Sequence, residues 1–376
     1  MKILFCGGGS GGHFYPLIAV AEALRDVTRK KKLIQPQLYY LASDPYDRAM
    51  LFDNEIEFQK ISSGKIRRYF SIRNFVDIIK TFLGFLSVLV KVYSIFPDVI
   101  LSKGGMMSLP VVISGKILGI PVIIHESDSV PGKANIYAAK FAKRIAISYA
   151  ETADYFDKTK TALTGNPIRQ DVITPVKEGA TEYLNLEPNT PVIFVLGGSL
   201  GAKRINDELV MCLPVLLNDY QIIHQTGKLN YDEILKTSSV VIQDHKFEKR
   251  YHPFDYMNSL AEKMSAGVAS LVISRGGSTI FEIAAWGLPS IIIPITEANG
   301  DHQRKNSYNY ARTGAALVIE ENNLTPEILI AQIKNLMSEP DRLKKMSEAA
   351  LSFAKTDAAY KVADEIINIA LKHEVV

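Results

Sequence analysis

Four short apolar runs in this sequence lead into paired glycines and then into a helical pattern of apolar residues. They are ILFC before Gly7, VILS before Gly104, VIFVL before Gly197 and LVIS before Gly276. Uninterrupted apolar strands are typical of parallel sheets that are buried on both faces, and a short turn into a helix is how such strands are connected. The sequence therefore predicts an α/β fold with doubly wound parallel sheets.

The junctions form two pairs, one in each half of a chain of 376 residues, a length that suits two domains of roughly 150 residues or more. We expect two Rossmann-like domains, residues 1–164 and 165–356. The apolar spacing from about 357 to 373 predicts a helix, and the pattern leaves open whether it packs back on the first domain. Five more runs fit buried strands: residues 37–43, 121–125, 144–148, 221–225 and 289–294.

Composition excludes several functional classes. A net charge of +3 argues against a nucleic-acid-binding protein. Cys6 and Cys212 form neither a disulfide framework nor a cysteine-based zinc site, and the metal-ligand motifs H-E-x-x-H and D-x-D are absent, so we expect no metal. The apolar start MKILFC is too short for a signal peptide, which indicates a cytoplasmic protein.

A locally basic and apolar stretch at residues 65–91 has two interpretations. Charged residues interrupt its apolar run, so it does not predict a membrane-spanning helix. It fits either an amphipathic helix that lies on anionic lipid or a core helix with solvated ends. The residues that would meet lipid are Phe75, Ile79, Phe82, Phe85, Leu86, Arg67, Arg68 and Arg73.

The first glycine loop, residues 7–16, reads GGGSGGHFYP. Its G-x-G-x-x-G spacing fits a dinucleotide site, and glycines at a helix N-terminus also suit any anion that backbone N–H groups can reach. His13 follows the glycines directly, where an imidazole could act as a base or merely cap the turn. A carboxylate just past a strand, Glu126, has the same two interpretations: a base or an acceptor of loop hydrogen bonds.

The second half contains three further candidate sites. Residues 197–207, GGSLGAKRIND, suit a phosphate cradle or a tight packing turn. Thr279-x-x-Glu282 reads as a helix capping box or as part of a ligand site. His302 and Gln303 open another helix, where they could cap it or contact a ligand.

Together, eight segments resemble the bacterial undecaprenyldiphospho-muramoylpentapeptide β-N-acetylglucosaminyltransferases, which make lipid II and have the GT-B fold of two Rossmann-like domains facing a central cleft. The segments are GGGSGGHFYP, KGGMMSLP, HESDSVPGKAN, TGNPIR, GGSLGAKRIND, HQTGK, STIFEIAAWGLP and DHQRKN. The order of the eight is that of the family, and they cover nearly the whole chain.

The resemblance implies an inverting hexosyltransferase without a cofactor. It would move N-acetylglucosamine from UDP-N-acetylglucosamine to the 4-hydroxyl of the lipid-linked muramoylpentapeptide, in peptidoglycan synthesis. The N-terminal domain would hold the acceptor and sit peripherally on the cytoplasmic face of the anionic plasma membrane, alone or with other cell-wall synthesis proteins. The C-terminal domain would hold the donor.

Residue roles follow from the matching motifs. His13 and Glu126 match catalytic positions, and which of them is the base stays open. Acceptor positions are Gly7, Gly9, Ser10, Gly11, Gly12, Gly104, Gly105 and Asn135. Donor positions are Arg169, Gly198, Ser199, Asn206, Phe254, Thr279, Glu282, His302 and Gln303, with Asn306 just behind.

Three residues depart from the family pattern: Met106 replaces a tyrosine, Asp128 an asparagine and Leu200 a glutamine. Two other functional classes are carried alongside the transferase. A nicotinamide oxidoreductase would use the first glycine motif, and a non-catalytic, membrane-recruiting or sugar-nucleotide-binding protein would use the fold alone. Within the transferases, the alternative is another nucleotide-sugar-dependent GT-B enzyme.

Overall fold

The computed structural model describes residues 1–61, 73–198, 201–296 and 299–373. Its contacts divide the chain into unit 1, Met1–Arg169 with Thr356–Val376, and unit 2, Gln170–Lys355. The sequence places the boundary after residue 164, and the contacts place it after residue 169. The C-terminal residues belong to unit 1, which answers the question that the sequence pattern left open.

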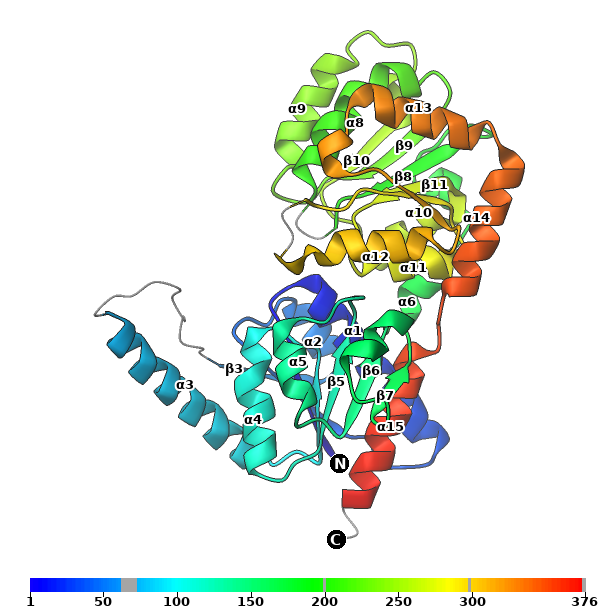
Figure 1. The fold of residues 1–376 in the computed structure, drawn as a ribbon. Coiled ribbons are helices and arrows are strands. Elements are labelled where there is room, and N and C mark those ends of the chain that lie inside the picture. The colour runs from blue at the N-terminus through cyan, green and yellow to red at the C-terminus, as the bar shows by residue number, and fades with distance from the viewer. Residues whose placement is uncertain (62–72, 199–200, 297–298, 374–376) are drawn as a thin grey trace. The chain divides into compact units, whose positions relative to one another are not determined.

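In its described part, unit 1 contains a seven-stranded sheet in the order β3-β2-β1-β4-β5-β6-β7, with every neighbouring pair parallel (Figure 1). Its strands are β1 (Lys2–Cys6), β2 (Gln37–Ala42), β3 (Ile56–Lys60), β4 (Val99–Ser102), β5 (Val122–Glu126), β6 (Arg144–Ile147) and β7 (Thr161–Leu163). Its helices are α1 (Gly11–Lys30), α2 (Arg48–Asp53), α3 (Arg73–Ile95), α4 (Leu109–Ile117), α5 (Lys133–Ala139) and α15 (Ala358–His373), with short 3₁₀ turns at Met106–Ser108 and Ala150–Tyr155.

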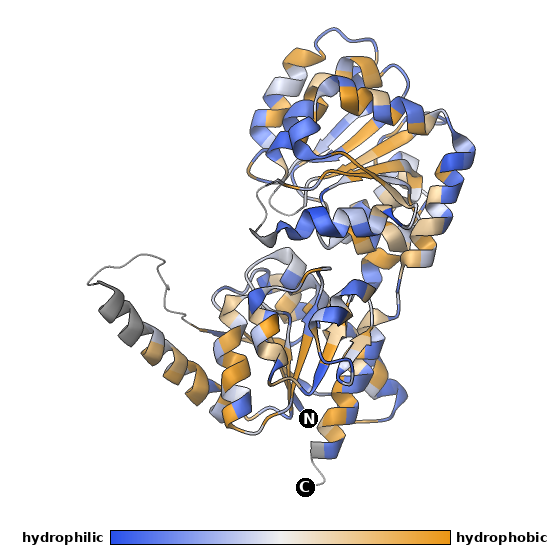
Figure 2. Ribbon diagram, in the orientation of Figure 1, coloured by the Kyte–Doolittle hydropathy of each residue, from blue (hydrophilic) through white to orange (hydrophobic). Residues whose placement is uncertain are grey.

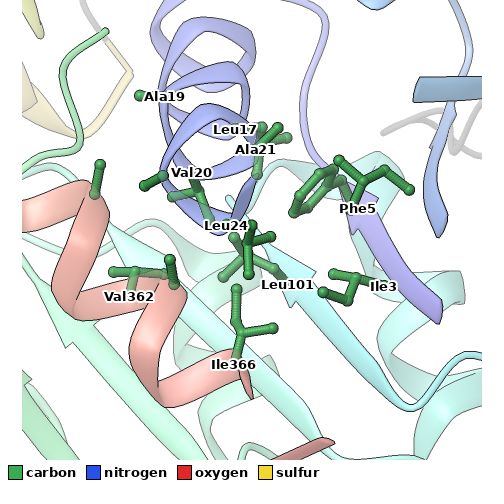
Figure 3. Packing of buried hydrophobic residues seen from close by; sticks show 14 of the residues in the cluster. Ile3, Phe5, Leu17, Ala19, Val20, Ala21, Leu24, Leu101, Val362 and Ile366 are labelled. Atoms are coloured by element: carbon green, nitrogen blue, oxygen red, sulfur yellow. The ribbon is translucent and has the colours of Figure 1, made fainter. Parts of the chain in front are cut away.

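Helix α15 is part of the core of unit 1. Its residues Val362 and Ile366 are buried and point toward Leu24 of α1 and Leu101 of β4 (Figure 3). Apolar residues recur along α15 at helical spacing, and burying that stripe removes it from water. A segment that begins 328 residues after the end of α1 thereby completes the N-terminal unit.

Unit 2 repeats the design with a six-stranded parallel sheet in the order β10-β9-β8-β11-β12-β13 among its described residues. Its strands are β8 (Val192–Leu196), β9 (Gln221–Gln225), β10 (Tyr251–Phe254), β11 (Ala269–Ser274), β12 (Ser290–Ile292) and β13 (Ala316–Val318). Its helices are α6 (Gln170–Ile173), α7 (Ala180–Tyr183), α8 (Lys203–Leu216), α9 (Tyr231–Val241), α10 (Ser259–Val268), α11 (Thr279–Trp286), α12 (His302–Ala311), α13 (Pro326–Met337) and α14 (Pro340–Phe353), with 3₁₀ turns at Glu248–Arg250, Asn299–Asp301 and Glu321–Asn323.

The nine predicted strand segments are confirmed as β1, β2, β4, β5, β6, β8, β9, β11 and β12, which are the interior strands of the two sheets. The four strands that the pattern did not predict are β3, β7, β10 and β13, and they are the four sheet edges. Edge strands are less buried, and three of the four, β3, β7 and β10, lack a continuous apolar run, whereas β13 is apolar but only three residues long. Strand β10 even contains Pro253, which a central strand would not tolerate. Figure 2 shows the interior strands as largely hydrophobic.

Candidate functional site

The two glycine turns of unit 1 pack against each other at the carboxyl ends of neighbouring strands β1 and β4. A methyl group on Gly105 would lie 3.0 Å from Cα of Gly8, and one on Gly104 would lie 2.8 Å from the side-chain nitrogen of Asn135. Both Gly104 and Gly105 have positive φ angles, +89° and +83°. Only glycine satisfies both the backbone conformation and the close approach.

His13 lies in the first turn of α1, which begins at Gly11 with Ser10 as the N-cap. Its Nδ1 shares a hydrogen bond of 2.8 Å with the Ser10 hydroxyl. Burial, with a further contribution from the nearby Lys103, lowers the pKa of His13 to about 4. The imidazole is therefore neutral at physiological pH, which a proton acceptor requires.

Glu126 ends β5 and is nearly fully buried. Its Oε1 accepts from the backbone N–H of Asp128 at 3.0 Å, and its Oε2 accepts from Gly132 N–H at 3.0 Å and from the Asn135 side chain at 2.9 Å. Burial raises the pKa of this carboxyl group, whereas the N–H donors act in the opposite direction. Both oxygens thus bind the loop between β5 and α5, which matches the hydrogen-bond-acceptor interpretation of this residue.

A buried polar cluster that the sequence patterns did not single out lies behind these residues. Lys103 Nζ is 2.8 Å from Nδ1 of His125 and 3.1 Å from Oδ1 of Asn166, and His125 Nε2 is 2.9 Å from the carbonyl oxygen of Gly165. Each of these three side chains is at most 4% exposed. The sequence signal that could have identified this cluster is Lys103 itself, a lysine that directly follows a buried strand and precedes two glycines.

Arg169, assigned from its motif to the donor, is the last residue of unit 1 before the division. Its guanidinium lies 4.8 Å from the centroid of the Tyr15 ring in α1, a cation–π distance, and the residue is 6% exposed. Tyr15 also packs edge-on against Tyr46. The structure therefore brings Arg169 to the same end of α1 as His13.

The glycine turn of unit 2 is tied to the strands beside it. The N–H of Gly197 donates to Gln225, and a methyl group on Gly201 would meet the carbonyl oxygen of Thr226. Gly198 has a φ of +75°. The N–H of Thr226 in turn donates to the carbonyl oxygen of Phe254 at 2.9 Å, so the glycine turn and Phe254 are connected through one residue.

Asn206 lies behind this turn rather than on it. It is fully buried, its Nδ2 donates to the Thr226 carbonyl at 2.9 Å, and its Oδ1 is 3.0 Å from Nε2 of His224. His224 Nδ1 is 2.8 Å from the Tyr251 hydroxyl, and burial lowers the pKa of His224 to about 3. The amide of Asn206 thus orients the backbone that supports the turn.

The capping-box interpretation of Thr279 and Glu282 is wrong. The N-cap of α11 is Ser278, and its side chain makes no capping hydrogen bond. Thr279 is already inside the helix, and Glu282 is half-buried in its first turn.

The start of α12 gives its two candidate residues different surroundings. The N-cap is Asp301, so neither His302 nor Gln303 occupies the capping position. Gln303 Oε1 accepts from the N–H of Ile295 at 3.2 Å, while His302 is half-buried beside Gly300. Asn306 is buried, and its Nδ2 donates to the carbonyl oxygen of Gly276 at 3.2 Å, which joins α12 to the fourth glycine turn, just before α11.

Helix α3 has two apolar faces in the portion whose side chains are described. Val88, Val92 and Ile95 are buried in the core of unit 1, whereas Phe82 is 59% exposed and Leu86 38%. One face thus packs in the core, as the core-helix interpretation expects, and the other face is exposed, as an amphipathic helix requires. Figure 2 shows the described part of α3 as predominantly hydrophobic.

Some predicted residues fall outside this description. Arg67, Arg68 and Ser199 lie outside the described residues, and for Arg73, Phe75 and Ile79 only the helical backbone is described. Phe85 is half-buried. In the part of the chain that the structure describes, no helix is long and apolar enough to cross a membrane, and no three His, Cys, Asp or Glu side chains form a group that could hold a metal ion.

Comparison with known proteins identifies the family of the chain. Residues 3–147 match the model described as the glycosyltransferase family 28 N-terminal domain, and residues 192–365 match the family 28 C-terminal domain. The chain belongs to glycosyltransferase family 28. The first match runs from β1 to β6, and the second begins at β8 and ends in α15.

Two family 28 relatives align along almost their full lengths. The UDP-N-acetylglucosamine--N-acetylmuramyl-(pentapeptide) pyrophosphoryl-undecaprenol N-acetylglucosamine transferase of Treponema denticola is 34% identical, over 96% of each chain. The protein of the same name from Halothermothrix orenii is 35% identical, over 94% of this chain and 95% of its own. The chain is therefore a glycosyltransferase related over both units to enzymes of that name.

Solved structures show the same fold. The crystal structure of Acinetobacter baumannii MurG matches with a TM-score of 0.73 at 23% identity, covering 98% of this chain and 99% of that chain. A UDP-GlcNAc 2-epimerase from Neisseria meningitidis matches with a TM-score of 0.66 at 13% identity, covering 98% and 100%. At these identities the likeness concerns the fold alone, and this family 28 chain has the two Rossmann-like units of the GT-B class.

Proposed function

We propose that this family 28 enzyme transfers N-acetylglucosamine from UDP-N-acetylglucosamine to the 4-hydroxyl of N-acetylmuramyl-(pentapeptide) pyrophosphoryl-undecaprenol, the step from lipid I to lipid II. The observation that carries the proposal is that relatives named for this activity align over more than nine-tenths of both chains. The acceptor is assigned to unit 1 and the donor to unit 2. The glycine turns of unit 1 suit the acceptor's diphosphate because their backbone can approach an anion closely.

Between His13 and Glu126, His13 is the base in this proposal. In the tautomer that donates Nδ1–H to Ser10, Nε2 has a lone pair for the acceptor's proton. The neutral state of the ring at physiological pH supports this role. Glu126 is the proposed positioning residue: its carboxylate oxygens are occupied by loop donors, so it holds the β5–α5 loop in place.

The chemical step is an inverting displacement. The acceptor oxygen forms a bond to the anomeric carbon, while the bond from that carbon to the β-phosphate oxygen breaks and its electrons leave with UDP. The hydroxyl proton passes to His13. The backbone N–H of Gly198 and the guanidinium of Arg169 would stabilise the charge that develops on UDP, which is often the largest electrostatic contribution to such catalysis.

The remaining donor contacts are proposed from the matched motifs. Glu282 would accept from the ribose hydroxyls, with Thr279 beside it, and His302 and Gln303 would contact the sugar. Phe254 begins the segment proposed for uracil, and its carbonyl oxygen is bonded to Thr226 behind the glycine turn. This connection supports one continuous donor site along the carboxyl ends of β8, β9 and β10.

The exposed apolar face of α3 is the proposed membrane contact. Phe82, Leu83, Val90 and Tyr93 are each more than half exposed, and a run of this kind is costly to leave in water. Basic residues earlier in the segment would meet anionic headgroups. The enzyme would thus sit peripherally on the cytoplasmic face of the plasma membrane, where its lipid-linked acceptor is found.

One assay separates the functional classes. Release of UDP from UDP-N-acetylglucosamine should require lipid I and yield a disaccharide product. Protection against thermal unfolding by NADH but not by the sugar nucleotide would favour an oxidoreductase, and donor binding without turnover would favour a non-catalytic protein.

Flotation with phosphatidylglycerol vesicles tests the membrane contact. Phe82→Asp should reduce vesicle binding, whereas Phe52→Asp, at an 83% exposed residue of α2, is the matched control and should not. Undiminished vesicle binding by Phe82→Asp would show that α3 is not the membrane contact.

A further inference from the structure

Lys103 is a buried cation at the centre of the acceptor side of unit 1. It directly follows β4, and it is 2% exposed. A methyl group on Gly7 would lie 3.4 Å from Cβ of Lys103 and 3.5 Å from Cβ of His13, so these two side chains flank the first glycine loop. The ammonium group is bonded to His125 and Asn166.

The partners of this ammonium group are neutral. His125 offers an imidazole nitrogen, because its other nitrogen faces the Gly165 carbonyl and burial lowers its pKa far below the usual value. Asn166 offers an amide oxygen. The negative charges of Glu126 and Asp128 oppose the effect of burial and favour the ammonium form of Lys103, and the carboxylate of Glu126 is also bonded to three N–H donors. A buried charge of this kind is costly unless it is compensated.

We infer that Lys103 is a positioning residue of the acceptor site: its buried ammonium group holds the His125–Asn166 pair beneath the glycine turns and supplies the positive charge that draws the acceptor's diphosphate to them. This inference rests on the proposed function for the identity of the anion. Lys103 acts through the protein rather than by contact with substrate, since it is almost completely buried. A diphosphate on the turns would add a negative charge of a kind that its hydrogen-bond partners lack.

The same charge acts on the proposed base. Among the causes that lower the pKa of His13, the positive charge of Lys103 is second only to burial, and Asp128 opposes it. A cation placed here makes a second positive charge on His13 unfavourable. Lys103 thus favours both the binding of an anion and the neutral imidazole.

The first test measures acceptor use. Lys103→Met should raise the KM for lipid I on the order of tenfold, because it removes the attraction between one positive charge and the diphosphate through an effective dielectric constant of about 20. The KM for UDP-N-acetylglucosamine should stay unchanged. Lys143→Met is the control, because Lys143 is an exposed lysine of the same unit. Equal acceptor KM values for Lys103→Met and wild type would overturn the inference.

The wild-type enzyme provides a test that needs no variant. Burial lowers the pKa of Lys103 to about 8, so its charge is lost as the pH rises through this range, well before that of an ordinary lysine. The acceptor KM should therefore rise between pH 7 and 9 while the donor KM does not. An acceptor KM that stays flat to pH 10 would contradict the inference even if Lys103→Met fails to fold.

A readout without turnover separates this inference from the proposed function. In a protein labelled with ¹⁵N-histidine, His13 should titrate near pH 4 in wild type and at higher pH in Lys103→Met. Lys103→Gln is the second variant, which retains polar contacts but not charge. If the His13 titration is unshifted in both variants, the electrostatic role of Lys103 is refuted, whatever the enzyme's substrate. If the titration shifts but the enzyme does not turn over lipid I, the proposed function is refuted instead.

Discussion

The side chain of Asn135 donates to Oε2 of Glu126 at 2.9 Å and thereby ties helix α5 to the end of strand β5. Asn135 is 3% exposed and also packs against Gly104 of the second glycine turn. One amide therefore connects the proposed positioning carboxylate to the turn assigned to the acceptor. Disturbing it should affect both stability and acceptor binding.

Asn135→Ala should lower the free energy of unfolding of unit 1 by about 1–3 kcal/mol, because it removes a buried hydrogen bond to a charged group. The measurement is urea unfolding followed by far-UV circular dichroism. Asn218→Ala is the control: its amide donates only to exposed helix carbonyls of Pro214 and Val215. Equal losses of unfolding free energy in the two variants would show that the Asn135–Glu126 hydrogen bond adds nothing to stability.

Gly105→Ala should lower the free energy of unfolding more than Gly119→Ala does. Both glycines have positive φ, +83° and +71°, so both variants incur a backbone strain of about 1 kcal/mol. Only at Gly105 would the methyl group also approach backbone, 3.0 Å from Cα of Gly8, whereas the space around Gly119 is open. The acceptor KM should rise for Gly105→Ala alone; an equal KM for both variants would argue against the paired turns as the diphosphate site.

His13→Ala should lower kcat by about 10²- to 10⁴-fold, the usual contribution of a positioned general base. In the wild type, kcat/KM should stay level as the pH falls below 6.5 and decline only near pH 4, because the pKa of His13 is lowered to about 4. A pH–rate profile measures this decline at low pH. Turnover of His13→Ala close to that of wild type would return the role of base to Glu126.

His224 should make unit 2 sensitive to acid. Its pKa is about 3 in the folded protein and about 6.5 when unfolded, so the unfolded state binds the proton first as the pH falls. This stability is fully present above about pH 6.5 and is lost as the pH falls toward 3. Between pH 7 and 5 the loss is about 2 kcal/mol.

Fluorescence of Trp286 is the measurement for this effect, since it is the one tryptophan of the chain and lies in α11 of unit 2. Its indole N–H donates to the carbonyl oxygen of Val172 at 2.7 Å, so unfolding of the unit should change its emission. His224→Gln should show a smaller decline in stability between pH 7 and 5 than the wild type. Parallel declines would mean that folding does not lower the pKa of His224.

Ile366→Ala should destabilise unit 1 by about 2–5 kcal/mol, the range for truncating a buried isoleucine. Circular dichroism should then show an earlier transition for part of the helical signal, while the Trp286 transition in unit 2 stays in place. Leu351→Ala, at a residue of α14 that is 55% exposed, is the control and should move neither transition by as much. A Trp286 transition that shifts with Ile366→Ala would show that the two units unfold together.

Much of the fold could be read from the sequence because interior parallel strands are buried on both faces. The run VIFVL, for example, is fully buried as β8. The edge strands could not be read in this way: β3 is IEFQK and exposes polar side chains, so its pairing with β2 depends on a neighbour 14 or more residues away. The first glycine motif likewise identified His13, and a strand end identified Glu126, but both left the role of the residue open.

What the sequence determined by itself is therefore the class of fold, the glycine turns and the residues on them, since short-range patterns report local burial and backbone conformation. Only the tertiary structure decided that α15 completes unit 1, that the carboxylate oxygens of Glu126 are bound by its own loop, and that Lys103 lies beneath the glycine turns with neutral partners. Each of these depends on contacts between segments that are brought together by folding, and the free energy of a buried charge depends on its surroundings in three dimensions.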